Sequence, residues 1–274
     1  MRFSSDQIQR IGKEISSKVD GKTLFDEFSR GRYSTDASVY QIKPLGVVLP
    51  KDTNDVLKLM EYSQKNSIPL LARGGGSSQC GQTVGESVVL DYSKHQNKIL
   101  ELNVEEKYVW VQPGVVLDHL NSFLRPYGLW FPVDVSTSSR ATIGGMSANN
   151  SCGSRSLYYG NMVHNVLAIE AILDDGSLHT FDQINKNYLT TTNNQDRFYK
   201  IIDKFLHLRQ KVSKDIDENW PTTQRRVGGY NIDLIDPNGF NSSNILVGSE
   251  GTLSLFNRIK LKSVSYTHLR AHET

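Results

Sequence analysis

Three consecutive glycines directly after an apolar, strand-like segment constrain this chain more than any other feature. Residues 68–72 have the strand pattern, and the glycine run follows with no intervening turn. Glycines lack a Cβ, so their backbone can approach an anion closely and present successive amides to it. We predict that this loop binds a phosphate or pyrophosphate, and the alternative is a surface turn with spare glycines. Its residues are Arg73, Gly74, Gly75, Gly76, Ser77 and Ser78, continuing to Gly81 and Gln82.

Two familiar phosphate-binding motifs fit this loop poorly. A dinucleotide fingerprint needs a third glycine where Gln79 stands, and it needs a helix directly after the loop. Residues 76–83 approach a Walker A motif, but Gln82 replaces the lysine that meets the β and γ phosphates. The sequence therefore argues against a Rossmann dinucleotide site and against hydrolysis of nucleoside triphosphates.

The first third of the chain predicts a small βαβ unit. An amphipathic helix is expected over residues 4–19, where Ser4 and Gln7 have the spacing of a capping box. Residues 47–49, 68–72 and 87–91 read as strands, and the pattern of residues 53–65 is helical. The strands and the helix together form the expected βαβ subdomain, which ends near residue 91.

The remaining segments predict a larger mixed subdomain, so the fold class is α+β with an antiparallel sheet and helices. A Pro113-Gly114 turn follows its first two strands, and Asp174, Asp175 and Gly176 supply the turn of a hairpin. A long loop is expected over residues 131–153. Further strands are expected at residues 98–103, 108–112, 165–173, 177–181, 244–247 and 252–261, and helices at residues 116–124 and 196–211.

Composition excludes several classes of protein. The 274 residues hold 31 Lys and Arg against 29 Asp and Glu, a net charge of +2, which is too balanced for a nucleic-acid surface. Mean hydropathy is −0.42, and the chain has no apolar run long enough for a transmembrane segment. The N-terminus lacks the apolar core of a secretory signal, so a cytoplasmic location is expected. Two cysteines, Cys80 and Cys152, and scattered histidines predict no metal site.

The end of the chain has an unusual composition. Residues 263–274 resemble the conceptual translation of a sequencing adapter, so they are set aside as a non-native tail. The alternative is a genuine polar tail. We expect the natural reading frame to continue past Lys262, which would make this chain an N-terminal fragment.

Two further glycine-containing segments could line a ligand. Residues 131–153 form a long polar stretch whose small side chains would let the backbone lie against a flat molecule, and Thr142 and Asn150 offer hydrogen bonds. Residues 246–253 have the pattern of a strand broken by a glycine turn, which is also compatible with an ordinary bulge.

These segments, in this order, resemble the PCMH-type FAD-binding domain of the vanillyl-alcohol oxidase and p-cresol methylhydroxylase superfamily. The resemblance covers about residues 40–261 and implies a two-subdomain FAD-binding fold. It predicts an N-terminal helical extension over residues 1–39 and an FAD-binding domain over 40–262, with subdomains at about 40–91 and 92–262. Within the superfamily the chain is most similar to the FAD-linked D-2-hydroxyacid dehydrogenases, which include D-lactate dehydrogenase, D-2-hydroxyglutarate dehydrogenase and the glycolate oxidase flavin subunit.

The resemblance also implies which residues contact FAD. Ser77 and Ser78 stand where branches with covalent flavin often carry histidine, so non-covalent FAD is expected. Cys152 and Asp174 depart from the family pattern of glycine and proline. Besides the first loop, the implied FAD contacts are Pro113, Gly114, Pro132, Asp134, Ser136, Thr137, Thr142, Gly144, Gly145, Ala148, Asn150, Gly153, Tyr159, Gly160, Val163, Glu250 and Gly251.

The implied activity is oxidation of a small D-2-hydroxy acid by hydride transfer to the flavin N5 atom, with electrons passing on to a cytochrome, a quinone or another flavoprotein. Such an acceptor could bring the protein to the inner membrane as a peripheral partner. The catalytic base is unassigned and is expected in a later cap domain, and an iron–sulfur cluster is expected only beyond this chain. Arg226, Tyr230 and His164 are the candidates for catalysis, and the alternatives are a solvated basic turn for Arg226 and Tyr230 and a structural role for His164. The alternatives are an FAD-binding module without turnover and a flavoenzyme similar to UDP-N-acetylenolpyruvoylglucosamine reductase.

Overall fold

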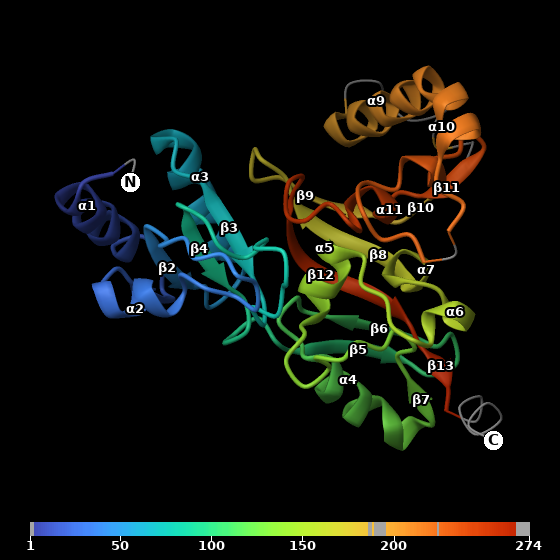
Figure 1. The fold of residues 1–274 in the computed structure, drawn as a ribbon, viewed down its shortest axis with the longest axis horizontal. Helices are drawn as coiled ribbons and strands as arrows, with labels where there is room; N and C mark the ends of the chain where they lie inside the picture. The colour runs from blue at the N-terminus through green and yellow to red at the C-terminus, as the bar shows by residue number, and fades with distance from the viewer. Residues whose placement is uncertain (1–2, 186–187, 189–195, 224, 267–274) are drawn as a thin grey trace.

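Two sheets lie on either side of a cluster of loops and short helices in the computed structural model (Figure 1). The structure describes residues 3–185, 188, 196–223 and 225–266. A four-stranded sheet near the N-terminus and a five-stranded sheet carry the two main apolar cores. The predicted α+β class is confirmed, because the first sheet is mainly parallel and the second is antiparallel.

The first sheet has the order β1-β2-β4-β3. Its last three strands are parallel, and β1 runs antiparallel to β2 at one edge. Helix α3, Thr53–Asn66, connects β2 to β3 and confirms the expected βαβ unit. The short helix α2, Glu27–Arg32, lies between β1 and β2 in the chain. The strands are β1 (Lys22–Leu24), β2 (Gly46–Leu49), β3 (Leu70–Arg73) and β4 (Val88–Asp91).

The N-terminal segment packs onto this first sheet. Helix α1, Ser5–Ser16, begins with the predicted capping box between Ser4 and Gln7. Its apolar stripe, including Ile8 and Ile15, is buried in the same cluster as residues of α3 and β4. Residues before position 40 therefore contribute a helix and a strand to the first subdomain.

A buried carboxylate attaches this N-terminal segment to α3. Asp55 is fully buried and accepts backbone N–H groups from Asp20, Gly21 and Lys51, each at 2.8 Å. Buried charge is tolerated when its oxygens are hydrogen-bonded in this way. The first turn of α3 thus fixes the chain that leads from α1 into β1.

The second sheet has the order β5-β6-β12-β8-β9, all antiparallel. Strand β12, near the end of the described chain, lies at its centre between β6 and β8. The predicted hairpin is confirmed as β8 and β9. The strands are β5 (Ile99–Asn103), β6 (Tyr108–Val111), β8 (Val166–Ile172), β9 (Leu178–Phe181) and β12 (Leu255–Lys262).

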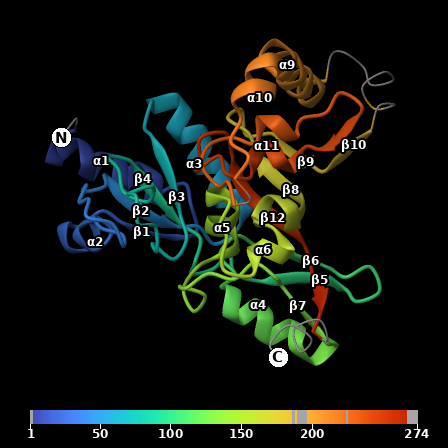
Figure 2. The same ribbon diagram turned by 45° about the vertical axis from the view of Figure 1, so that its right-hand side comes forward.

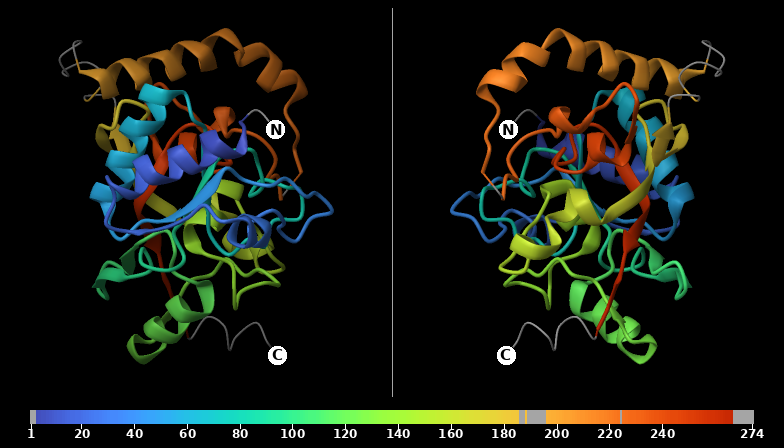
Figure 3. Two further views of the ribbon diagram at one scale, coloured as in Figure 1. Left: turned by 90° about the vertical axis from the view of Figure 1, so that its left-hand side faces the viewer. Right: turned by 90° about the vertical axis from the view of Figure 1, so that its right-hand side faces the viewer.

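Helices surround the second sheet. Figures 2 and 3 show α9 and α10 running one after the other along the top of the molecule, far from α4 at the bottom. The predicted helix over residues 196–211 is confirmed as α9. The helices are α4 (Leu117–Leu124), η1 (Arg125–Tyr127), α5 (Ile143–Asn149), α6 (Ser156–Tyr159), α7 (Met162–Asn165), α9 (Arg197–Lys211), α10 (Ser213–Asn219), η2 (Ile232–Leu234) and α11 (Ser243–Leu246).

Two predictions of local structure were wrong. The strand expected over residues 244–247 is helix α11, because a short apolar run does not distinguish a buried helix from a strand. The loop expected over residues 131–153 contains helix α5, with Thr142 as its N-cap. Its two glycines suggested irregular structure, yet the backbone there is helical.

Two pairs of short strands complete the structure. Strand β10, Gln183–Asn185, pairs with β11, Gly239–Asn241. Strand β13, Val264–Ser265, pairs with β7, Leu129–Trp130, and Ser263 is buried beside it. The beginning of the segment set aside as a tail therefore contacts the second subdomain, and residues 267–274 lie outside the described residues.

Candidate functional site

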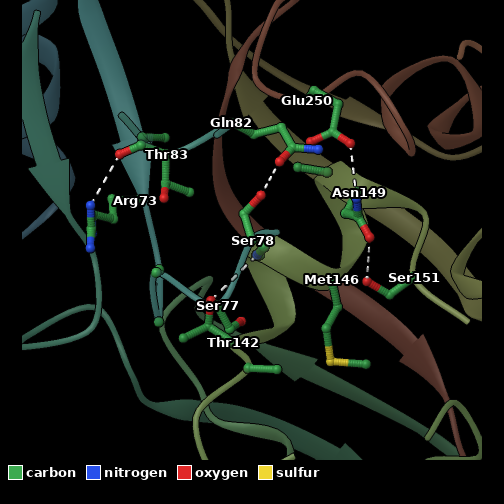
Figure 4. A pocket seen from close by; sticks show the side chains of 18 of the residues that line it. Arg73, Ser77, Ser78, Gln82, Thr83, Thr142, Met146, Asn149, Ser151 and Glu250 are labelled. Atoms are coloured by element: carbon green, nitrogen blue, oxygen red, sulfur yellow. Dashed lines mark hydrogen bonds between the residues drawn. The ribbon is translucent and has the colours of Figure 1, made fainter. Parts of the chain in front are cut away.

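A cavity of about 460 Å³ lies where the two subdomains meet (Figure 4). The glycine loop after β3 forms one wall, and the segment that leads into α5, together with α5 itself, forms another. The turn after α11 and the start of β12 complete it. Its volume lies within the range of about 300–1,000 Å³ that is typical of sites for small ligands and cofactors.

Most of the predicted cofactor contacts line this cavity. They come from four segments that are far apart in sequence, so the fold brings the separate motifs to one place. The lining includes Arg73, Gly74, Gly75, Gly76, Ser77, Ser78, Gln82, Pro113, Ser136, Thr137, Thr142, Gly144, Gly145, Ala148, Glu250 and Gly251.

The other predicted contacts lie outside the lining, and two of them hold neighbouring loops through hydrogen bonds. Asp134 accepts the backbone N–H of Arg155 at 3.0 Å, and Asn150 accepts that of Val163 at 3.0 Å. Both side chains hold loops in place behind the cavity. The residues outside the lining are Gly81, Gly114, Pro132, Asp134, Asn150, Gly153, Tyr159, Gly160 and Val163.

Sequence reasoning missed a further set of lining residues. Neighbours of the glycine motifs, such as Gln79, could have been found by extending each motif by a few positions. Tyr92 and Phe256 could not, because only the sheet pairing brings them to the cavity. The missed residues are Leu71, Ala72, Gln79, Cys80, Thr83, Tyr92, Val135, Ala141, Met146, Asn149, Ser151, Cys152, Val227, Ser254 and Phe256.

The glycine loop presents backbone donors that the protein itself does not use. Among the described residues, the amide N–H groups of residues 75–79 donate no hydrogen bond to a protein acceptor. Gly76 has a φ of 64°, in the left-handed region where glycine is favoured. A run of uncommitted amides beside a cavity is suited to an anion such as a phosphate.

Close packing requires glycine at some positions of this wall. A Cβ on Gly75 would overlap the carbonyl oxygen of Arg140, and a Cβ on Gly144 would lie 2.6 Å from the Cβ of Pro113. Gly145 is different, since it is exposed and its nearest neighbour would be the Thr142 hydroxyl at 3.3 Å. The wall formed by α5 therefore carries no side chain at Gly144 and Gly145, where it borders the cavity.

Arg73 braces the glycine loop. Its guanidinium donates to the carbonyl oxygens of Thr35 at 2.8 Å and Thr83 at 3.1 Å, and it lies over the ring of Tyr33 at 5.3 Å. Burial lowers the pKa of Arg73, and the nearby carboxylates Asp91 and Asp36 partly offset this effect. The side chain therefore fixes the loop to the first subdomain and is not free to clamp a ligand.

Glu250 is an acidic side chain in the lining. Figure 4 shows it beside Gln82 and Asn149, and the Asn149 side-chain amide donates to its Oε1 at 2.9 Å. Burial raises the pKa of Glu250, and hydrogen bonds from Asn149 and Gln82 counteract part of that rise. Its φ of 52° is uncommon outside glycine, so the surrounding turn holds it in a strained conformation.

The three candidate catalytic residues do not line the cavity. Arg226 makes two hydrogen bonds of 2.7 Å to Asp233 and stacks over Trp220. The ring Nδ1 of His164 accepts the Asn161 backbone N–H at 3.0 Å. Burial, followed by the charge of Arg226, lowers the pKa of His164.

Tyr230 also has a partner away from the cavity. Its hydroxyl shares a hydrogen bond of 2.7 Å with the hydroxyl of Thr252. In the segment of residues 225–231, Val227 is the residue that reaches the lining. The predicted basic turn therefore makes its side-chain contacts outside the cavity.

Two other kinds of site are absent from the part of the chain that the structure describes. No group of three or more His, Cys, Asp or Glu side chains there could hold a metal ion. None of the helices described has both the length and the apolar character needed to cross a bilayer.

Comparisons with known proteins agree with this geometry. The family model "FAD binding domain" matches residues 44–182. D-2-hydroxyglutarate dehydrogenase from Haemophilus influenzae is 36% identical over 241 residues, covering 83% of this chain and 23% of that protein. The enzyme of the same name from Escherichia coli is 34% identical over 251 residues, covering 88% of this chain and 24% of that protein.

A solved structure supports the fold. Alkyldihydroxyacetonephosphate synthase superposes with a TM-score of 0.63 at 17% identity, covering 96% of this chain and 44% of that one. At this identity the likeness concerns the fold alone. The chain spans about a quarter of the length of the two curated relatives.

Proposed function

Because this chain belongs to the FAD binding domain family, we propose that it is the flavin-binding part of an oxidoreductase that acts on D-2-hydroxy acids. The names of the two curated relatives support the substrate class. FAD is the cofactor that the family match supports. The activity, the substrate and the electron acceptor belong to the proposal.

The observation that carries the proposal is the run of uncommitted amides in residues 75–79 beside the cavity. FAD has a pyrophosphate, and backbone amides on glycine and serine provide several donors at short range without a charged side chain. The close packing of Gly75 on Arg140 fixes the loop before a ligand arrives. The residues present therefore fit an FAD pyrophosphate.

The other wall suits a flat ring system. Gly145 and Ala148 of α5 present little side chain toward the cavity, and Met146 adds an apolar surface beside them. When bound, FAD supplies a two-electron acceptor, and the protein supplies binding, orientation and electrostatics. We propose that α5 supports the ring system and that the glycine loop holds the pyrophosphate without a covalent bond, since Ser77 and Ser78 offer no imidazole.

One observation favours a second candidate function, an FAD-binding module without turnover. A substrate carboxylate calls for a guanidinium clamp, and Arg73, the arginine in the described lining, is committed to main-chain carbonyls. Arg226 is paired with Asp233 outside the cavity. We propose that residues found in the longer relatives, beyond those matched here, hold the hydroxy acid and pass electrons to a cytochrome, quinone or flavoprotein.

A reduction assay separates the two candidates. The chain is loaded with FAD and mixed anaerobically with D-2-hydroxyglutarate, D-lactate or glycolate, and loss of the flavin's visible absorbance is followed. The H. influenzae relative serves as the full-length control. Positioning of substrate contributes roughly 7–11 kcal/mol to such reactions, so the chain alone should bleach negligibly.

Each outcome of this assay is informative. Bleaching of the chain at the rate of the full-length control would place the substrate site within this chain and remove the second candidate. Failure of the chain to take up FAD would contradict the flavin assignment itself.

A further inference from the structure

A second cavity, of about 380 Å³, shares a wall with the first. Arg73, Gly74 and Gly75 belong to the lining of both, so the glycine loop separates them. The remaining residues come from both subdomains. From the first come Arg32, Tyr33 and Asp91, and from the second come Ser93, Val116, Ser139 and Arg140.

Two charged groups in this second cavity already have partners. Asp91 accepts the Tyr33 hydroxyl at 2.6 Å and the backbone N–H and hydroxyl of Ser93 at 2.9 and 2.6 Å. The Arg73 guanidinium donates to the main-chain carbonyls described above. Neither group requires a ligand to satisfy it.

Arg32 and Arg140 differ from these two. Both are exposed, and within the ranges that the structure describes neither guanidinium has a hydrogen bond or an ion pair. Arg32 is the last residue of α2 and Arg140 precedes α5, so they approach the cavity from different subdomains. Two positive groups that line one cavity favour the binding of an anion there.

We propose that this second cavity binds a small oxyanion, the phosphate or carboxylate group of a ligand, held by Arg32 from one subdomain and Arg140 from the other. A guanidinium binds either group through two parallel N–H donors, which a lysine cannot reproduce. Ser139 lines the cavity beside Arg140 and offers a hydroxyl donor. The bound anion connects the two subdomains.

The site also adjoins the main cavity. The carbonyl oxygen of Arg140 is the atom that a Cβ on Gly75 would overlap, so the main chain at Arg140 packs on the glycine loop. An anion on the Arg140 side chain therefore sits on the outer side of the wall whose amides we assign to the FAD pyrophosphate. The two sites use different chemistry, guanidinium groups in one and backbone amides in the other, and this difference allows them to be tested separately.

The experiment is isothermal titration of the FAD-loaded full chain with inorganic phosphate and, separately, with succinate. FAD occupies the glycine loop, so the phosphate signal comes from outside it. If FAD does not load, the cofactor-free chain is titrated instead, and the arginine variants then separate binding in the second cavity from binding at the loop amides, so failure of the flavin proposal stays distinct from failure of this one. Saturable binding of phosphate alone indicates a phosphate ligand, binding of succinate alone a carboxylate ligand, and binding of both an oxyanion site in general.

Variants identify the site. Arg32→Ala with Arg140→Ala should weaken binding by at least about tenfold, because each removes charge-assisted hydrogen bonds. Arg32→Lys with Arg140→Lys should bind with intermediate affinity. Arg125→Ala is the matched control, since Arg125 is an exposed arginine in η1 outside this cavity, and it should bind like the unmodified chain.

Three results would overturn the proposal. These are the absence of saturable binding of either anion, undiminished binding by the double alanine variant, and an equal loss in the Arg125→Ala control. Both arginines are exposed, so the melting temperature of the double variant should stay close to that of the unmodified chain.

Discussion

Two adjacent glycines of α5 should respond in opposite ways to an added side chain. In Gly144→Ala, the new Cβ would lie 2.6 Å from the Cβ and 2.9 Å from the carbonyl oxygen of Pro113, which is closer than side-chain atoms normally approach. Overpacking of this kind costs about 1–3 kcal/mol of folding free energy. In Gly145→Leu, the Cβ has the Thr142 hydroxyl as its nearest neighbour at 3.3 Å, and the rest of the side chain extends into the main cavity.

The expected magnitudes follow from that geometry. Gly145→Leu should keep the free energy of unfolding of the cofactor-free chain within about 1 kcal/mol of the original, because leucine favours a helix more than glycine does. If the intruding side chain costs the bound state about 1–3 kcal/mol, FAD affinity should fall roughly 5- to 150-fold. Gly144→Ala should instead lower the free energy of unfolding.

The assay pairs urea unfolding of the cofactor-free chain with titration of FAD, followed by the change in flavin fluorescence. Gly145→Ala provides a smaller side chain at the same position and should give an intermediate affinity. Undiminished FAD affinity in folded Gly145→Leu would refute the assignment of the α5 wall to the flavin. A loss of stability equal to that of Gly144→Ala would refute the distinction between the two glycines.

Three other predictions concern the charge of Glu250, the hydrogen bonds of buried Asp55 and the way in which FAD is attached. The pKa of Glu250 is raised in the folded chain, so ionisation of this side chain destabilises the fold. The destabilisation is complete above the folded pKa, and it disappears when the pH falls well below the unfolded value of 4.5. Glu250→Gln should therefore raise the melting temperature near about pH 8 and not near about pH 3.5, and an equal effect at both would contradict this cause. Asp55→Ala leaves the amides of Asp20, Gly21 and Lys51 without their acceptor and should cost about 1–3 kcal/mol in urea unfolding, whereas a loss below about 0.5 kcal/mol would mean that solvent replaces it. Acid precipitation of the FAD-loaded chain should leave all flavin in the supernatant; a yellow pellet would indicate a covalent bond, and Cys80→Ser and Cys152→Ser would then show whether a lining thiol forms it.

The glycine loop was predictable because its physical reason is local. A run of glycine and serine directly after a strand favours a loop with accessible backbone amides, and this preference depends little on the rest of the fold. The βαβ unit around Thr53–Asn66 follows from hydrophobic periodicity. Helix α5 was not predictable in the same way. Its Gly144-Gly145 pair disfavours a helix by propensity, and the reason for Gly144 is the contact with Pro113, a residue thirty-one positions earlier in the chain.

The residues of the candidate site also divide into those that a local motif predicts and those that only the fold brings to the cavity. Gly251 and Thr142 lie in recognisable motifs, but Tyr92 and Phe256 reach the cavity only because strands distant in sequence pair as they do. Arg226 carries the guanidinium that a carboxylate clamp needs, but its partner in the structure is Asp233, seven residues later in the chain. A sequence pattern indicates which groups are available, and packing decides which of them face a ligand.

The central claim, that the glycine loop binds the pyrophosphate of FAD, is tested most directly by comparing FAD with FMN. FMN carries the same ring system and a single phosphate. Equilibrium dialysis of the full chain should show one FAD bound per chain and FMN weaker by at least about 100-fold, because FMN lacks the AMP half of FAD, which includes the second phosphate that the loop amides would hold. Equal affinities for FAD and FMN, or no binding of FAD, would contradict the account.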